Sequence, residues 1–440
     1  MHYTFSSHFL LHPFCKHISE KLRYSFYRTA WRACRHMTKN PKLHIPRPSA
    51  RPGDKPDFSY LDLSPAGTVD KPPIDARASD IENLALELVR VLDDDHDAQG
   101  PWDPGLDKET LVRALKLMVL TRAFDDRMQR MQRQGKVTFY MQALGEEAVS
   151  IGQGLAFEPD DMLFPAYRNQ GLYIMRDTGL VDMMCQCLSN SRDMCKGRQM
   201  PIFYQNKEKN LFTISGNLAT QFPQAVGWAM GAAIKGEDNI AASWVGDGST
   251  AEADFHYALT FAAVYHAPVV LNVTNNQWAI STFQGFAGGD RRPFAARGLG
   301  LGIPGIRVDG NDLLAVYSTT RWAADRARKG GGPTLIELVT YRGGAHSTSD
   351  DPSRYRPKDE WADFPLGDPL ERLKQHLVKL GHWTETEHSE LEAEMKNTVT
   401  EAWKEAVSHG TLTEPPFLDV RVMFEDVFAE MPEHLKKQQD

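Results

Sequence analysis

The chain has 440 residues, of which 41% are hydrophobic and 25% are charged, a composition typical of a soluble globular protein. Its formal net charge of -8 argues against a nucleic-acid partner, because no overall basic field would attract phosphates. A membrane helix needs roughly 18 consecutive apolar residues, and the most apolar stretch, 258–273, is interrupted by Tyr265, His266 and Pro268. We therefore expect neither a nucleic-acid nor a membrane partner.

Residues 1–36 differ in composition from the rest of the chain. Their only acid is Glu20, against the basic side chains of Lys16, Lys21, Arg23, Arg28, Arg32 and Arg35. Targeting peptides are rich in arginine and poor in acids, so one interpretation is a transit peptide to the mitochondrial matrix. We favour the other interpretation, an upstream extension of the reading frame with the working start at Met37. In that case residues 1–36 are an extra N-terminal segment outside the fold.

Residues 37–105 are expected to form an extended, proline-rich arm. Eight prolines lie between Pro41 and Pro73 among polar residues, which disfavours both helices and central strands. Such an arm often drapes over a partner subunit, and a disordered tail is the alternative.

Residues 106–410 are expected to form one α/β domain, followed by a C-terminal tail over 411–440. Asp107 is a good helix cap, and apolar residues at helical spacing from Leu111 to Met128 predict a helix that ends at Gly135. Short apolar runs separated by helical stretches then predict a doubly wound parallel sheet flanked by helices. The predicted strands are 162–164, 240–245, 269–273, 306–308 and 335–339, and two charged helices follow at 369–380 and 385–408.

Two predicted strands end in polar residues that suit a metal-bound diphosphate. Gly246-Asp247-Gly248 follows the strand that ends at Val245, and Asn275 and Asn276 follow the next strand. In doubly wound sheets, ligands bind outside the carboxyl ends of the strands. One carboxylate, one amide oxygen and a backbone carbonyl suit Mg²⁺, which takes its remaining ligands from water and phosphates.

The residues after this turn add an anion site to the same strand end. Ser249, Thr250 and Glu252 are expected to open the next helix, whose exposed amides attract anions. The sequence therefore predicts a magnesium–diphosphate clamp.

Two other patterns are weaker than they look. Residues 300–305 match G-x-G-x-x-G, but a Gly/Arg-rich loop precedes them, a strand follows, and Pro304 lies inside. A dinucleotide site needs a strand before and a helix after, so we expect a flexible loop and no nicotinamide enzyme.

The five cysteines are poorly spaced for disulfides. Cys185 and Cys187 are expected to be buried thiols on a helix.

Beyond the clamp, several segments resemble one family. They are residues 165–168 (PAYR), 196–201 (KGRQMP), 214–221 (ISGNLATQ), 307–312 (RVDGND) and 346–351 (HSTSDD). Together they resemble the thiamine diphosphate-dependent alpha chains of branched-chain 2-oxo acid (2-oxoisovalerate) dehydrogenases, the decarboxylating component. The resemblance covers roughly residue 54 to the C-terminus, and Gln277-Trp278 is similar to the bacterial branch.

The resemblance implies roles for individual residues. Magnesium would be held by Asp247, Asn276 and the backbone of Trp278. The cofactor would contact Tyr167, Arg168, Gly216, Leu218, Gly248, Ser249, Glu252, Arg342 and His346. A monovalent cation such as K⁺ would lie in the loop of Ser215, Asn217, Thr220 and Gln221. His346 would be the catalytic residue, an imidazole that titrates near neutrality, although a loop histidine bonded to backbone is the plainer interpretation.

The resemblance also implies the activity and the partners. The enzyme would decarboxylate branched-chain 2-oxo acids and transfer the acyl group to lipoyl groups of a transacylase core, in branched-chain amino acid catabolism. A separate beta subunit would complete a two-alpha, two-beta heterotetramer in the bacterial cytoplasm. Thr274 stands where many relatives carry an arginine, so one phosphate contact is missing. The alternatives are the alpha chain of a pyruvate or acetoin dehydrogenase and a degenerate regulatory subunit of the same fold.

Overall fold

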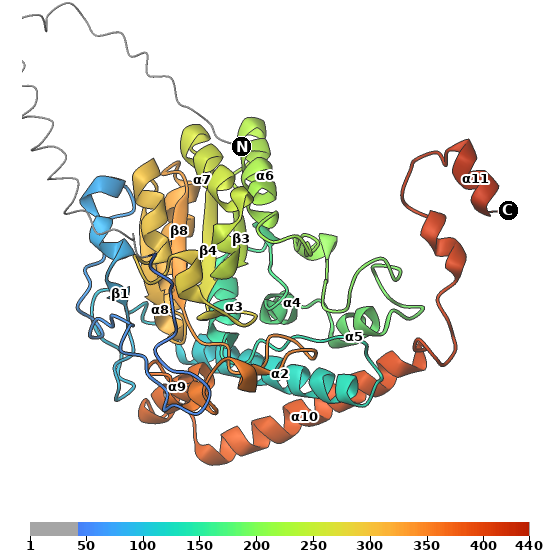
Figure 1. Ribbon diagram of the computed structural model, residues 1–440, viewed down its shortest axis with the longest axis horizontal. Helices are drawn as coiled ribbons and strands as arrows, with labels where there is room; N and C mark the ends of the chain where they lie inside the picture. Colours follow the sequence, from blue (N-terminus) through green and yellow to red (C-terminus); the bar gives the residue numbers. More distant parts are fainter. Residues whose placement is uncertain (1–42, 440) are drawn as a thin grey trace, which may run out of the picture. The chain divides into compact units, whose positions relative to one another are not determined.

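The computed structural model describes residues 43–439, and the expected extra segment over 1–36 lies outside them. Residues from Pro46 onward form a single unit built around one sheet (Figure 1). Its six strands are parallel and lie in the order β1-β7-β8-β4-β3-β2. They are β1 (Leu88–Val89), β2 (Met162–Phe164), β3 (Ala241–Gly246), β4 (Val269–Asn275), β7 (Gly305–Asp309) and β8 (Thr334–Val339).

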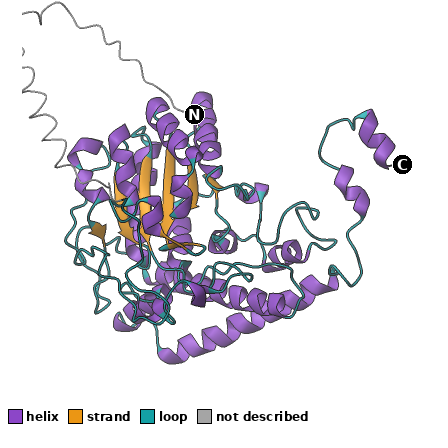
Figure 2. Ribbon diagram, viewed as in Figure 1, coloured by secondary structure: helices purple, strands orange, loops and turns teal. Residues whose placement is uncertain are grey.

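Helices cover both faces of this sheet, as the apolar pattern predicts (Figure 2). Successive side chains of a strand point to opposite faces, and β4 shows it clearly. Val269, Leu271 and Val273 pack with α6 (Gln221–Lys235) and α7 (Ala253–Tyr265), whereas Val270 packs with α3 (Glu147–Ala156) and α8 (Leu313–Arg328). The doubly wound fold is therefore confirmed.

The remaining helices follow, of which α11 (Glu433–Gln439) lies apart from the sheet (Figure 1). The others are α2 (Lys108–Arg133), α4 (Gln170–Met175), α5 (Leu180–Leu188), α9 (Pro369–Lys379) and α10 (Glu385–Ser408). Asp107 caps α2 by accepting a hydrogen bond from the Thr110 amide, as expected. The thiols of Cys185 and Cys187 are buried on α5, again as expected.

The proline-rich segment is held by its own chain. Residues 46–77 contain no helix or strand. The Trp322 indole donates to the Pro72 carbonyl (2.8 Å), and Arg326 donates to the Ile74 carbonyl (2.6 Å). Further along, β1 joins the edge of the sheet beside β7, a two-residue strand that the apolar pattern does not predict.

Two local expectations were wrong. Residues 249–252 do not open a long helix: a 3₁₀ turn over Gly248–Ala251 comes first, and Glu252 then stands at the N-cap position of α7 without a side-chain capping hydrogen bond. The G-x-G-x-x-G stretch is not simply a flexible loop, because a 3₁₀ helix, Phe294–Leu301, runs into it and β7 begins at Gly305. A helix before and a strand after is the reverse of a dinucleotide site. Among residues 43–439, no helix is long and apolar enough to cross a membrane.

Candidate functional site

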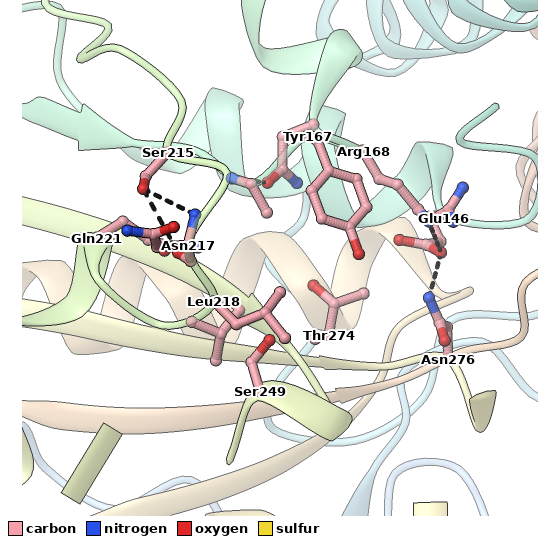
Figure 3. Close-up of a pocket in the computed structure, with 14 residues that line it drawn as sticks. Glu146, Tyr167, Arg168, Ser215, Asn217, Leu218, Gln221, Ser249, Thr274 and Asn276 are labelled. Atoms are coloured by element: carbon pink, nitrogen blue, oxygen red, sulfur yellow. Dashed lines mark hydrogen bonds and ion pairs between the residues drawn. The ribbon is translucent and has the colours of Figure 1, made fainter. Parts of the chain in front are cut away.

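The carboxyl ends of β3 and β4 border two adjoining cavities. Both cavities are lined by Tyr167, Arg168, Leu218, Gly246, Ser249 and Asn276. The first also contains Glu146, Ser215, Asn217, Gln221 and Thr274 (Figure 3), and the second also contains Asp247, Gly248, Trp278 and His346. Most of the residues expected in the site are therefore brought together. Gly216, Thr220, Glu252 and Arg342 line neither cavity.

The register of the sheet brings the two polar strand ends together. Gly246 of β3 pairs with Thr274 of β4, so Asp247 and Asn276 follow at the same edge. A side chain at Gly246 would meet no atom within 4 Å, whereas one at Gly248 would come within 2.3 Å of the Ala279 side chain. Gly246 thus leaves space open to a ligand, and Gly248 allows the hairpin of β5 (Trp278–Ala279) and β6 (Thr282–Phe283) to pack closely.

Asp247 is buried and only partly satisfied. Its Oδ1 accepts a hydrogen bond from the Gly248 amide (2.9 Å), but its Oδ2 is buried without a partner among the residues that the structure describes. Burial raises the pKa of Asp247 to about 7, and the neighbouring Glu146 adds to the rise. A buried carboxylate oxygen without a partner is costly unless a cation compensates it. The Asp247 site therefore fits a hard divalent cation with oxygen ligands.

The two asparagines at the end of β4 differ in orientation. The Asn276 amide donates from Nδ2 to Glu146 Oε1 (2.7 Å), and its Oδ1 accepts from the Trp278 amide (3.3 Å). Asn275 lines neither cavity and donates instead to Glu337 Oε1 (2.8 Å) and Gln284. Asn276 is therefore the asparagine that faces the site, as expected.

Arg342 is directed at backbone oxygens rather than at a cavity. Its guanidinium donates to the carbonyls of Trp278 (2.8 Å) and Ile280 (2.9 Å) and to the Tyr355 hydroxyl (2.7 Å). In this arrangement it holds the turn that carries Trp278. The Trp278 carbonyl expected to face magnesium is thus an acceptor for Arg342.

His346 lies against Arg168 and Tyr167. Arg168 Nη2 donates to the His346 carbonyl (2.5 Å) and lies 3.1 Å from Nδ1, while the Tyr167 ring meets the imidazole edge-on at 6.0 Å. Burial, followed by Arg168 and Arg342, lowers the pKa of His346 to about 3. The expected titration near neutrality is therefore wrong for this arrangement. Because a guanidinium can only donate, Nδ1 accepts and Nε2 carries the proton of a neutral ring.

The loop expected to hold a monovalent cation gathers oxygen atoms. Thr220 donates its hydroxyl proton to Ser215 Oγ (2.8 Å), and its Oγ1 also lies 3.0 Å from the Asn217 carbonyl. Gln221 donates through Nε2 to the Trp244 carbonyl, and its Oε1 is buried without a partner.

Glu146 is a site residue that the sequence does not predict. It precedes α3 directly, where an acid reads as an ordinary helix-terminal charge. Its neighbour Glu147 does have a structural partner, Arg122, at 2.7 Å. Only the folded chain shows Glu146 in the cavity beside Asn276.

Comparison with known proteins identifies the class to which this fold and site belong. Residues 115–414 match the family described as "Dehydrogenase E1 component". Residues 39–79 match "2-oxoisovalerate dehydrogenase E1 alpha subunit N terminal". Dehydrogenase E1 components depend on thiamine diphosphate, which agrees with a metal–diphosphate clamp at the strand ends.

Individual relatives narrow the class further. The chain is 59% identical to the 2-oxoisovalerate dehydrogenase subunit alpha of Pseudomonas aeruginosa over 397 residues, 90% of this chain and 97% of the relative. It is 37% identical to the mitochondrial 2-oxoisovalerate dehydrogenase subunit alpha of Homo sapiens over 431 residues, 93% of each chain. The corresponding mitochondrial alpha subunit 2 of Arabidopsis thaliana is 38% identical over 381 residues, 85% of this chain and 78% of the relative. The chain belongs to the family of 2-oxoisovalerate dehydrogenase alpha subunits.

Proposed function

We propose that this chain is the alpha subunit of a branched-chain 2-oxo acid dehydrogenase that binds thiamine diphosphate through Mg²⁺. The observation that carries the proposal is the buried, unpartnered Oδ2 of Asp247 in the cavity shared with Asn276, Arg168 and His346. A degenerate, non-catalytic subunit would have no reason to keep such a costly group. Similarity to alpha subunits named for 2-oxoisovalerate favours branched-chain substrates over pyruvate or acetoin.

The residues of the cavity divide into two groups by what they can hold. Asp247 and Asn276 offer oxygens to Mg²⁺, and the Trp278 carbonyl, which accepts from Arg342, offers its second lone pair. Tyr167, Arg168 and Ser249 offer donors to the diphosphate. Thiamine diphosphate, when bound, supplies the carbon nucleophile for the 2-oxo carbon and accepts the electron pair left by carbon dioxide. The protein positions the reactants and excludes water.

His346 is the residue of this chain that we assign to proton handling. Arg168 holds the ring through Nδ1 and the backbone carbonyl, which leaves the Nε2 proton available. A neutral imidazole with a fixed tautomer donates a hydrogen bond from one defined atom. Arg168 therefore orients His346 in addition to contacting the diphosphate.

A beta subunit is proposed to complete the site. The outer sides of α6 and α7 expose large apolar side chains, namely Ile234, Tyr257, Phe261, Val264 and Tyr265. Leu218, which lines both cavities, is 48% exposed. Exposed apolar side chains grouped on neighbouring helices are typical of a protein interface, and the family name of an alpha subunit implies a beta partner. We further propose a two-alpha, two-beta assembly that docks a lipoylated transacylase.

The cation loop and the location complete the proposal. The oxygens around Ser215 and the unpartnered Oε1 of Gln221 support a K⁺ site.

For the cellular location, the bacterial relative supports the cytoplasm of a bacterium, whereas the eukaryotic relatives are named mitochondrial. Residues 37–105 remain our proposed arm, 106–410 the cofactor domain and 411–440 the tail.

Co-expression with the beta subunit tests the function. The assembled complex should bind thiamine diphosphate only with Mg²⁺ and should decarboxylate 3-methyl-2-oxobutanoate faster than pyruvate or acetoin. Preference for pyruvate or acetoin would contradict the substrate assignment. Full decarboxylation by the purified alpha chain alone would contradict the shared site.

A further inference from the structure

We propose that Glu146 is a positioning residue that orients the metal-ligating amide of Asn276 and links it to the arginine that holds His346. The inference rests on the proposed function, because it assumes that Asn276 faces Mg²⁺. It concerns a side chain of this chain for which the clamp motif itself provides no role.

The geometry places Glu146 between the two halves of the site. Its Oε1 accepts from Asn276 Nδ2 at 2.7 Å and lies 3.9 Å from Arg168 Nε (Figure 3). Its backbone is fixed at the start of α3, where its amide donates to the Ala143 carbonyl and its carbonyl accepts from the Ser150 amide. The side chain is 3% exposed. Because the backbone of Glu146 is hydrogen-bonded and its carboxylate contacts Asn276, the buried side chain has little freedom to move.

The polarity of this contact decides which end of the Asn276 amide is available. The Asn276 nitrogen points toward Glu146, whose carboxyl oxygen accepts its proton. The amide oxygen is then on the opposite side, where it accepts from the Trp278 amide. Outer partners of this kind fix the orientation of metal ligands in proteins. Without Glu146, the amide could rotate and offer its nitrogen to the metal.

The carboxylate of Glu146 also lies close to the Arg168 guanidinium. Arg168 approaches it through Nε and uses its two terminal nitrogens elsewhere: Nη1 donates to the Gln142 carbonyl, and Nη2 to the His346 carbonyl. Glu146 is therefore the nearest buried counter-charge of Arg168. One carboxylate thus supports both the metal ligand and the residue that orients the imidazole.

The neighbouring asparagine provides a control within the same strand end. Asn275 donates to buried Glu337 at 2.8 Å, as Asn276 donates to Glu146 at 2.7 Å. Asn275 and Glu337 lie outside both cavities of the site. Removing Glu337 therefore makes the same chemical change beside an asparagine that does not face the metal.

The test uses the alpha–beta complex and the Mg²⁺ concentration that half-saturates thiamine diphosphate binding, measured by calorimetry. Glu146→Ala should raise this concentration about 10–100-fold, the usual cost of losing an outer partner of a metal ligand. Glu146→Gln should raise it much less than Glu146→Ala, because its amide oxygen can still accept from Asn276, although the negative charge beside Arg168 is lost. Glu337→Ala should also stay near the wild type, even if it lowers the melting temperature. Equal Mg²⁺ requirements for Glu146→Ala and Glu337→Ala would overturn the inference.

A reciprocal exchange decides the matter even if Glu146→Ala fails to fold. Asn276→Asp alone sets two carboxylates against each other and should raise the Mg²⁺ requirement. Combining it with Glu146→Gln reverses the hydrogen bond, so the Gln amide donates to the new carboxylate. The double variant should then recover at least about tenfold over the single one, within the range for outer-partner effects. No recovery would overturn the inference.

The failure of the inference and the failure of the proposed function are distinguishable. If wild-type complex binds thiamine diphosphate equally with and without Mg²⁺, the proposed function is wrong. If the wild type requires Mg²⁺ but neither Glu146→Ala nor the exchange behaves as expected, only the role of Glu146 is wrong.

Discussion

Two buried aspartates at the carboxyl edge of the same sheet differ in whether the chain supplies partners for their carboxylate oxygens. Asp309 ends β7, and its Oδ2 accepts from Arg372 at 2.7 Å with Arg90 at 3.4 Å. Its Oδ1 accepts from the Asn311 amide at 2.9 Å. Asp247 follows β3 and has a single amide donor, while its Oδ2 has no partner. Both side chains are buried.

The difference teaches which of two similar residues is structural. The chain supplies the cations for Asp309 from its own arginines, so nothing further is needed there. At Asp247 no cation among residues 43–439 contacts the free oxygen, and the open space at Gly246 lies beside it. Buried charges are normally paired or coordinate metals. The partner of Asp247 is therefore expected to come from solution.

The strongest way to break this comparison is Asp247→Asn. It should reduce Mg²⁺-dependent binding of thiamine diphosphate, and activity with it, by more than about 100-fold, because a direct ligand outweighs an outer partner. The cofactor-free complex should keep its melting temperature, since the change removes an unpaired charge. Calorimetry and thermal unfolding of one preparation measure both effects. A cofactor-free variant that is much less stable would mean that Asp247 is structural.

His346→Asn sharpens the comparison by separating cofactor retention from chemistry. Cofactor binding should stay close to that of the wild type, because Asp247 and Asn276 are intact. Acyl transfer to lipoamide should fall about 10²–10³-fold, the range for losing one positioned hydrogen-bond donor at a reacting centre. Steady-state kinetics with a 2-oxo acid and lipoamide measures the rate. Transfer at the wild-type rate would remove His346 from the mechanism.

Asp309→Asn is the structural counterpart of the first change. It leaves Arg372 buried without its closest negative partner, and breaking a buried ion pair costs about 3–5 kcal/mol. The free energy of unfolding, measured by denaturant titration, should fall by that amount. The Mg²⁺ requirement of the folded variant should be unchanged. If Asp309→Asn were less destabilising than Asp247→Asn, the two assignments would have to be exchanged.

A third buried aspartate, Asp125, tests how burial of a carboxyl group affects stability as the pH changes. Within residues 43–439, Asp125 accepts from the Tyr140 hydroxyl and the Ala143 amide alone, both at 2.6 Å, and burial raises its pKa to about 7. The folded protein keeps a proton that the unfolded chain loses above about pH 4. This contribution to the unfolding free energy is therefore present below pH 4 and falls as pH rises to 7, by at most about 1.4 kcal/mol per unit. Comparing melting temperatures of wild type and Asp125→Asn across this range measures it, and parallel curves would contradict it.

The sheet and the meeting of Asp247 and Asn276 at one of its edges could be predicted, because their signals are local. Buried parallel strands are continuous apolar runs, and the residues after them meet at one edge. Asp247 and Asn276 could be placed from that rule alone. The strand β1 could not, because two residues held in place by β7 carry no pattern of their own.

The rest of the site depends on contacts between distant segments. Glu146 reaches Asn276 across 130 positions of the chain, so no spacing could indicate it. Arg342 could be expected to bind phosphate from its chemistry, but the turn at Trp278 and Ile280 determines where it points. The pKa of His346 depends on burial and two arginines, which a motif does not encode.

Titration of thiamine diphosphate into the assembled alpha–beta complex tests the central claim most directly. The two arms of the experiment contain Mg²⁺ or a chelator, with the Asp247→Asn complex as the matched control. The account predicts tight binding by the wild type with Mg²⁺, and weak binding both in the chelator and by the variant. Equal affinity in all of these samples would contradict the claim that Asp247 recruits the metal that holds the cofactor.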